Sequence, residues 1–305
     1  MSRFDSLSES QLANWVDQAK AQASSGRVVD RISLLKAANP NWLALHISTL
    51  QQIYSAGETD RVFPLMSVIK PFALLYLLEA FGSHSVFQWV GIEPSDRPFN
   101  SLEQLAADQG YPRNPMLNSG AIVLASKLPG HSGTERCAAL CTWLNQQAGC
   151  RLKLDQEMLA AVRSVGQGTN RAIATFLAKA GYLADPQTAL DTYEQICCLS
   201  GTVADLALLG QLLVQGYASA SSIQPAYRRI VNTLMLTCGL YEASSHYAMQ
   251  VGLPMKSGIS GALLAIVPTE GVIACYSPAL DTIGNPVAAL ALIKHMADHL
   301  DLHVF

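Results

Sequence analysis

The sequence predicts an α+β protein, with one antiparallel sheet built from both ends of the chain and a helical lobe inserted between them. Strand patterns occur near both ends, at residues 42–50 and 262–276, and the stretch between residues 100 and 240 is mostly helical in pattern. A regular alternation of strands and helices, which a parallel α/β sheet would require, is not visible.

The expected organisation is a single domain over residues 1–305. An N-terminal helix occupies residues 1–25, and residues 26–66 together with 250–305 form the sheet lobe. Residues 67–249 form the mainly helical lobe. A chain of this length can bury one sizeable core, which supports the plan.

The N-terminal elements follow from local patterns. Residues 6–25 carry apolar residues at helical spacing, and Ser6 with Glu9 matches a capping box at the start of this helix. Residues 42–50 alternate between apolar and polar, which predicts a strand. Residues 68–81 are apolar almost all round, which is typical of a buried helix.

The C-terminal elements are a hairpin and a helix. Two short apolar runs, 262–267 and 272–276, are separated by the turn sequence Pro-Thr-Glu-Gly, which predicts two antiparallel strands. A final helix is expected over residues 286–299.

Composition excludes several classes of protein. Half of the chain is hydrophobic, only 14% is charged, and the net charge is −3, so the chain is not disordered. It lacks the basic excess of a nucleic-acid binder. The low charged fraction, against about 25% in an average domain, favours a large core, a subunit interface or both.

No membrane span, metal or cofactor is expected. The most apolar run, residues 72–78, is shorter than the ~18 residues of a spanning helix, and the N-terminus lacks an apolar signal core. Seven cysteines without a CxxC pair are typical of reduced thiols in a cytoplasmic protein. His295, His299 and His303 recur every four residues without a partner ligand nearby, which favours a surface stripe over a metal site.

An S-x-x-K pattern at Ser67 and Lys70 points to nucleophilic catalysis. On a helix, residues three apart share a face, so a buried lysine with a lowered pKa can take the proton of the serine hydroxyl. Pro71 belongs in a first helical turn, so Ser67 is expected near a helix N-terminus. The pattern alone is weak, because Ser33–Lys36 carries it too.

A second pattern strengthens this interpretation. Lys256-Ser257-Gly258 lies just before the predicted hairpin, and penicillin-recognising serine hydrolases combine S-x-x-K with K-[ST]-G on an edge strand. The glycine lets substrate approach the backbone, where an N–H group can contribute to an oxyanion hole.

Further motifs make the chain resemble the serine-dependent glutaminases. The resemblance runs from about residue 8 to the C-terminus and rests on five segments: Phe63 to Lys70, Val90 to Asn100, Asn114 to Ile122, Cys238 to Tyr241, and Val251 to Gly258. It implies a β-lactamase-like or transpeptidase-like fold and hydrolysis of the glutamine side-chain amide without a metal or other cofactor. It also implies a homodimer or homotetramer.

The resemblance also implies roles for individual residues. Ser67 would be the nucleophile, Lys70 its base, and Tyr241 a proton-transfer residue whose pKa a neighbouring Lys256 ammonium lowers. The backbone N–H groups of Ser67 and Ile259 would form the oxyanion hole. The residues expected to hold the substrate are Asn118, Asn170 and Tyr193.

Two substitutions depart from the family pattern at the expected substrate pocket. Arg31 replaces a tyrosine, and Arg163 stands where the family has the glutamate that recognises the ammonium of glutamine; with a one-residue deletion that position falls on Ser164. An ammonium beside Arg163 without a carboxylate would be repelled.

These departures leave three hypotheses open. The chain hydrolyses a carboxylate-bearing amide without a free ammonium, which suits Arg31 and Arg163. Alternatively, it is a true glutaminase in which the ammonium is bound by another acid, such as Glu242 or Glu93, or by a neighbouring subunit. The third alternative is a catalytically silent relative that binds a ligand or partner.

Overall fold

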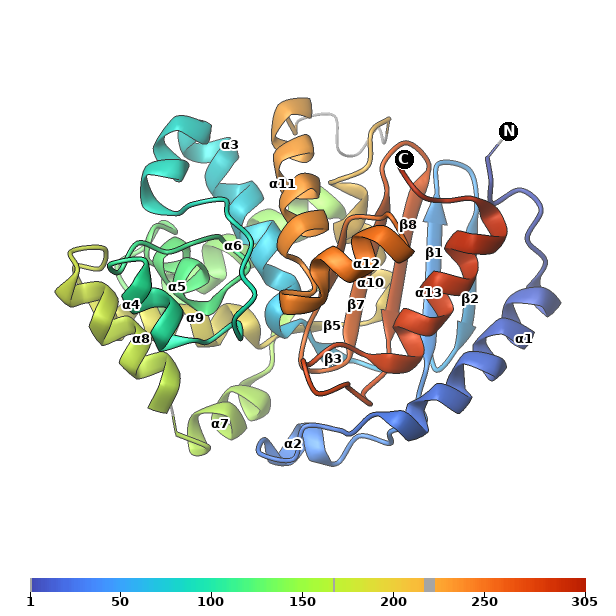
Figure 1. The fold of residues 1–305 in the computed structure, drawn as a ribbon, viewed down its shortest axis with the longest axis horizontal. Helices are drawn as coiled ribbons and strands as arrows, with labels where there is room; N and C mark the ends of the chain where they lie inside the picture. The colour runs from blue at the N-terminus through green and yellow to red at the C-terminus, as the bar shows by residue number, and fades with distance from the viewer. Residues whose placement is uncertain (1, 167, 217–222) are drawn as a thin grey trace.

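The computed structural model describes residues 2–166, 168–216 and 223–305 (Figure 1). Its centre is a five-stranded antiparallel sheet with the strand order β2-β1-β8-β7-β6. The strands are β1 (Ala44–Thr49), β2 (Ile53–Gly57), β6 (Met255–Ser257), β7 (Ala262–Val267) and β8 (Gly271–Tyr276). Because β1 pairs with β8, the sheet joins the two ends of the chain, which confirms the predicted α+β fold.

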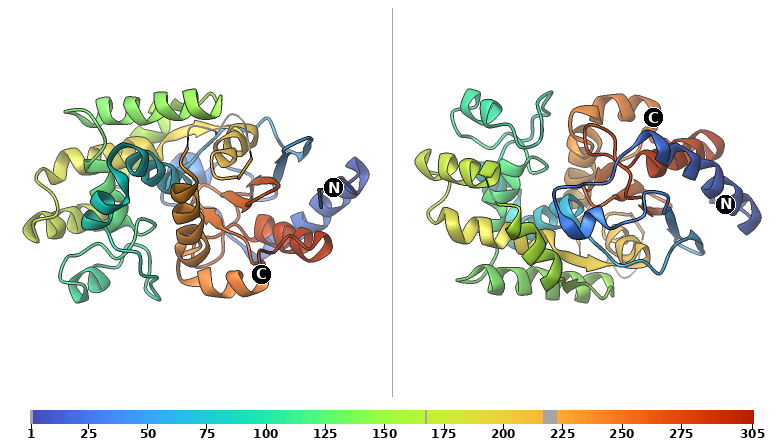
Figure 2. Two further views of the ribbon diagram at one scale, coloured as in Figure 1. Left: turned by 90° about the horizontal axis from the view of Figure 1, so that it is seen from above. Right: turned by 90° about the horizontal axis from the view of Figure 1, so that it is seen from below.

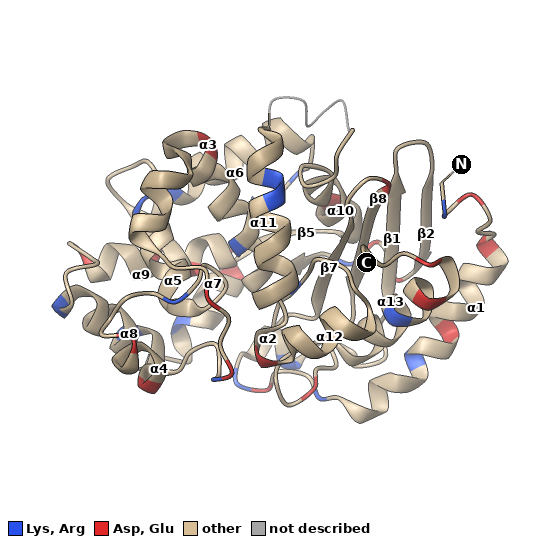
Figure 3. Cartoon of the chain, turned by 45° about the horizontal axis from the view of Figure 1, so that its top comes forward, with Lys and Arg blue, Asp and Glu red and all other residues tan. Residues whose placement is uncertain are grey.

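Helices cover both faces of this sheet. On one face lie α1 (Glu9–Lys20) and α13 (Val287–Leu300), and on the other lies α10 (Val203–Gln211). Alternate residues of β7 therefore enter two separate hydrophobic clusters, and every residue of β7 and β8 is buried. Strands β1, β2, β7 and β8 accordingly carry no Lys, Arg, Asp or Glu (Figure 3).

The helical part lies on the side of the molecule away from the two termini (Figure 2). It is formed mainly by α3 (Lys70–Trp89), α4 (Leu102–Ala107), α5 (Asn118–Ser126), α6 (Gly133–Ala148), α7 (Gln156–Ser164), α8 (Gly168–Lys179) and α9 (Pro186–Cys197). The short helix α2 (Ser33–Lys36) precedes the sheet, and α11 (Pro225–Cys238), the 3₁₀ turn η4 (Tyr241–Ala243) and α12 (Ser244–Gln250) lead back to it. A small sheet of β3 (Phe63–Pro64), β5 (Leu199–Gly201) and β4 (Lys153–Leu154) lies next to η2 (Met66–Ile69).

The N-terminal helix begins later than the sequence pattern predicts. The capping box at Ser6 was wrong, because the chain still turns there, and the N-cap is Ser8, whose side chain accepts a hydrogen bond from the Gln11 backbone N–H. The helix is α-helical to Lys20 and continues as the 3₁₀ helix η1 (Ala21–Ser25).

The other predicted elements are present with shifted ends. The predicted strand at 42–50 is β1, the hairpin is β7–β8, and the final helix is α13. The helix expected over 68–81 extends to Trp89 across a break at Gly82, whose φ of 75° is left-handed.

The segment Met66–Trp89 is long and apolar enough to span a membrane on length and composition alone. In the structure 67% of its most apolar window is buried inside the protein, and the segment carries Ser67 and Lys70 at its N-terminal end. We therefore assign it to the protein core.

Candidate active site

Ser67 lies in the turn that leads into the central helix. It belongs to η2, which continues directly into α3, and Pro71 occupies the first turn of α3 as its fixed φ favours. Met66 adopts a left-handed φ of 48°, a conformation that costs a non-glycine residue about 1–2 kcal/mol. Such strain is typical of functional sites, because the surrounding fold must hold it in place.

Lys70 is buried, and its amine donates two hydrogen bonds. Its Nζ donates to the Met116 carbonyl and to Asn118 Oδ1, each at 2.8 Å. Burial lowers the pKa of Lys70 to about 8, since the low-dielectric interior disfavours its charged form. The amine can therefore lose its proton near neutral pH, as a general base must.

Asn118 connects the lysine to the residues expected to hold the substrate. Its Oδ1 also accepts a hydrogen bond from Tyr193 Oη at 3.0 Å, and its Nδ2 donates to Asn170 Oδ1 at 2.8 Å. The structure thus brings together Lys70, Asn118, Asn170 and Tyr193, although they come from four different helices.

The loop before α5 carries Met116 and leads into Asn118, the two residues that accept hydrogen bonds from Lys70. Asn114 ties this loop together: its Nδ2 donates to the Glu93 carbonyl at 2.7 Å, and its Oδ1 accepts from the backbone N–H groups of Met116 and Leu117. A Cβ at Gly120 would meet the Asn114 carbonyl at 2.0 Å, which explains the glycine in this motif.

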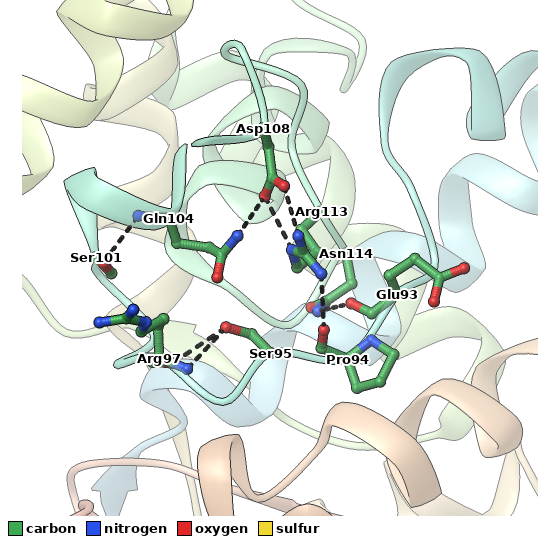
Figure 4. A network of polar contacts seen from close by, with 9 residues as sticks. All are labelled: Glu93, Pro94, Ser95, Arg97, Ser101, Gln104, Asp108, Arg113 and Asn114. Atoms are coloured by element: carbon green, nitrogen blue, oxygen red, sulfur yellow. Dashed lines mark hydrogen bonds and ion pairs between the residues drawn. The ribbon is translucent and has the colours of Figure 1, made fainter. Parts of the chain in front are cut away.

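A second contact braces the same loop from outside. Arg113 donates to both carboxylate oxygens of Asp108, at 2.9 and 2.5 Å, and its hydrogen bond holds the pKa of Asp108 below its ordinary value (Figure 4). The bidentate geometry is the strong form of such a pair.

Tyr241 and Lys256 lie on the sheet side of Ser67. Lys256 Nζ donates to the Ser257 carbonyl at 2.7 Å and lies 4.3 Å from the centre of the Tyr241 ring. Burial raises the pKa of Tyr241 to about 12, although a hydrogen bond with the Ser67 side chain opposes this.

The expected effect of Lys256 on Tyr241 is therefore not found. Burial, and then the neighbouring Lys70, hold the pKa of Lys256 well below its ordinary value. An amine that gives up its charge cannot stabilise a phenolate, so burial determines the pKa of Tyr241.

The end of β6 approaches the backbone of Ser67. β6 is an edge strand, as the K-S-G pattern predicts, and Gly258 follows it. A Cβ at Gly258 would lie 2.7 Å from the Leu65 carbonyl and 3.4 Å from the Ser67 backbone nitrogen. Only a residue without a side chain permits this approach, which brings the segment carrying Ile259 against Ser67.

A cavity of about 140 Å³ opens in front of Ser67 and is called the Ser67 cavity below. Its size matches a small ligand, because one water occupies ~30 Å³ in the liquid. The predicted site residues that line it are Arg31, Ser67, Asn118, Asn170, Tyr193 and Ile259. Lys70, Tyr241 and Lys256 lie behind this lining, buried in the protein.

Arg163 lies beside the Ser67 cavity and not in its lining. It contributes to a neighbouring cavity of about 710 Å³, where its guanidinium pairs with Asp191 and, through Nε at 3.5 Å, with Glu194. Ser164 is the alternative position for the family glutamate. Its hydroxyl donates a hydrogen bond to the Ala161 carbonyl, and it lines neither cavity.

The two acids considered from the sequence do not line the Ser67 cavity. Glu93 belongs to a separate apolar groove and Glu242 to none of these cavities. Glu194, which sequence reasoning missed, lines the Ser67 cavity directly. Its position next to Tyr193 was the available signal.

Among the described residues, no group of three or more His, Cys, Asp or Glu side chains is arranged to hold a metal ion.

Comparisons with known proteins agree with this geometry. The model of the glutaminase family matches residues 26–305. A glutaminase from Synechocystis sp. is 44% identical over 98% of this chain and 91% of its own length. The crystal structure of a probable glutaminase from Bacillus subtilis aligns with a TM-score of 0.89 at 31% identity, covering 97% of both chains.

A further structure concerns a covalent complex. It contains a Bacillus subtilis glutaminase joined to 5-oxo-L-norleucine after reaction with 6-diazo-5-oxo-L-norleucine. It aligns with a TM-score of 0.87 at 30% identity, over 97% of this chain and 99% of that chain.

Proposed function

Because the chain belongs to the glutaminase family, we propose that it hydrolyses the side-chain amide of L-glutamine to L-glutamate and ammonia. The chain is an amidohydrolase of the serine-dependent type. The observation that carries the proposal is the pairing of Ser67, at the wall of a small cavity, with the buried amine of Lys70 in the next turn.

The first half-reaction forms an acyl-enzyme. Lys70 removes the proton of the Ser67 hydroxyl, and Oγ attacks the amide carbon, whose carbonyl electrons move onto oxygen. The backbone N–H groups of Ser67 and Ile259 stabilise this oxyanion. When the C–N bond breaks, the nitrogen takes up the proton held by Lys70, relayed by the Tyr241 hydroxyl, and leaves as ammonia.

The second half-reaction returns the enzyme to its starting state. Water attacks the ester carbon, and Lys70 takes the water proton as it took that of Ser67. Collapse of the second tetrahedral intermediate breaks the C–O bond to Ser67, which regains its proton, and glutamate is released. Asn118, Asn170 and Tyr193 hold the substrate during both steps.

The decisive experiment measures ammonia release from L-glutamine by the purified protein and by Ser67→Ala. We expect the alanine variant to lose activity by about 10⁴-fold or more, as removal of a catalytic nucleophile does in other serine hydrolases. Absence of release from the native protein at millimolar glutamine, with and without phosphate, would rule out glutamine as the substrate.

A second candidate substrate is a carboxylate-bearing amide without an ammonium group. Arg31, which lines the Ser67 cavity and is exposed, favours it, because a guanidinium pairs well with a carboxylate. The same contact would hold the α-carboxylate of glutamine. A panel of amides with and without the α-amino group separates the two candidates by their kcat/KM values.

We also propose that the protein works as a homodimer or homotetramer in the cytoplasm. The low charged fraction of the chain supports an interface, and the seven cysteines, all free thiols, support a reducing compartment. Light scattering of the purified protein gives the oligomer size, and cell fractionation gives the compartment. A monomer or a secreted protein would contradict these proposals.

A further inference from the structure

Glu194 places a carboxylate at the wall between two cavities. It lies on α9 directly after Tyr193, and it lines both the Ser67 cavity and the larger cavity beside it. Of the described residues that line the Ser67 cavity, Glu194 alone carries a carboxylate. Its side chain is only 5% exposed.

Arg163 forms an ion pair with this carboxylate. The guanidinium comes from α7 and pairs with Asp191 and Glu194, which lie one turn apart on the same side of α9. The three side chains together carry one excess negative charge. The pairing therefore neutralises part of the acidic charge on this face of α9.

A carboxylate can serve a guanidinium and an ammonium at once. Its two oxygens offer about four acceptor positions, so the contact with Arg163 does not exhaust them. In a buried site the attraction between opposite charges is stronger than in water, because the effective dielectric constant is lower.

We propose that Glu194 is the specificity-determining residue that binds the α-ammonium of the substrate, and that Arg163 is its positioning residue. This inference rests on the proposed function. The family resemblance places the ammonium-binding glutamate at position 163, or at 164 with a one-residue deletion, on α7; in this proposal Glu194 on α9 takes that role and Arg163 orients it.

The kinetic test compares two substrates that differ only in the α-amino group, L-glutamine and 4-carbamoylbutanoate. Glu194→Gln keeps the shape of the side chain and removes its charge. We expect KM for L-glutamine to rise at least about tenfold, with little change in kcat, while kcat/KM for 4-carbamoylbutanoate stays within about threefold. Equal effects on both substrates would overturn the proposal.

Asp191→Asn is the matched control, because Asp191 contacts the same guanidinium but does not line the Ser67 cavity. We expect it to change the ratio of the two kcat/KM values by less than about threefold. A change as large as that of Glu194→Gln would assign the effect to Arg163 and overturn the role of Glu194. The native protein provides a test without any variant: equal kcat/KM for both substrates would also overturn the proposal.

A binding measurement separates this inference from the proposed function. Calorimetry with Ser67→Ala and with Ser67→Ala/Glu194→Gln reports L-glutamine affinity without turnover. A loss of at least about tenfold in the double variant supports the role of Glu194 even if the native protein releases no ammonia, which would refute only the hydrolysis of glutamine. Equal affinities, or no binding to Ser67→Ala, would overturn the inference.

Discussion

At the scale of single residues, the candidate site places Ser67 directly after Met66, whose backbone is strained, and near two lysines whose pKa is lowered by burial. The Ser67 and Lys70 spacing could be read from the sequence, because it depends only on one helical turn. The partner of Arg163 could not, because it depends on how α7 packs against α9. The sequence therefore indicated the missing acid at position 163 but not the carboxylate of Glu194 in the lining of the Ser67 cavity.

The pKa of Lys70 predicts the pH dependence of catalysis. Below about pH 8 the amine carries a proton and cannot accept another from Ser67, so kcat/KM should rise about tenfold per pH unit and level off above about 8. A pH–rate profile on L-glutamine measures this. Lys70→Arg, which stays protonated throughout, should be inactive across the range, and an acid-side profile that is flat between pH 6 and about 8 would contradict Lys70 as the base.

Gly258 predicts a local steric effect on catalysis. In Gly258→Ala the new Cβ would meet the Leu65 carbonyl at 2.7 Å, so the backbone carrying the oxyanion donors has to shift. We expect kcat to fall roughly 10²- to 10³-fold, as when one oxyanion donor is lost.

A glycine in open space serves as the control for this substitution. Apart from its chain neighbours and the backbone of its own helix, no described atom lies within 4 Å of a Cβ added at Gly168, so Gly168→Ala should keep its activity. Equal activities of the two variants would show that the contact between Gly258 and the nucleophile turn is not needed for catalysis.

At the scale of elements, helices with a clear apolar pattern were predictable and the edge strand β2 was not. β2 is half exposed along its length and lacks an apolar run, so only its pairing with β1 identifies it. The helical stretch after Gly82 was likewise not predicted, because the sequence pattern indicates a helix that ends near residue 81. Tertiary contacts, and not local preference, set these boundaries.

The loop braced by Asp108 predicts a pH-dependent contribution to stability. Because Arg113 lowers the pKa of Asp108, the contribution is present above the ordinary value of 3.8 and is lost as the pH falls through the folded-state pKa. At pH 7, Asp108→Asn should reduce the free energy of unfolding by about 1.5–3 kcal/mol, the range for hydrogen bonds to charged groups.

Urea unfolding at pH 7 and at pH 3 checks this expectation. The difference in the free energy of unfolding between the native protein and Asp108→Asn should be smaller at pH 3. Asp60→Asn is the control, because Asp60 is largely exposed and its contact with Arg61 is 4.0 Å long. Its effect should stay below about 0.5 kcal/mol. Equal effects of the two variants would contradict a structural role for the Arg113 pair.

At the scale of the whole molecule, the sheet depends on strands from both chain ends. The α+β plan was predictable because the hairpin and the first strand have strong local patterns. The small sheet of β3, β5 and β4 was not, since its strands are only two or three residues long.

Truncation tests this dependence. A chain ending at residue 250 lacks β6, β7 and β8. Strand β1 then keeps β2 but loses β8, and the hydrophobic clusters on both faces of the sheet lose residues. We expect no cooperative thermal transition by circular dichroism, whereas a chain ending at residue 302 should retain one. A cooperative transition in the shorter chain would show that the helical part folds on its own.

The pairing of β1 with β8 has a consequence for the time course of synthesis. Ser67 and Lys70 are synthesised early. At about 5–20 residues per second, roughly ten or more seconds pass before the ribosome adds Lys256, Gly258 and the strand that pairs with β1. Until then β1 has only β2 as a partner, and an edge that β8 will occupy stays open. The nascent chain therefore acquires its catalytic power last, and we expect its first strands to be the segment most in need of protection by chaperones.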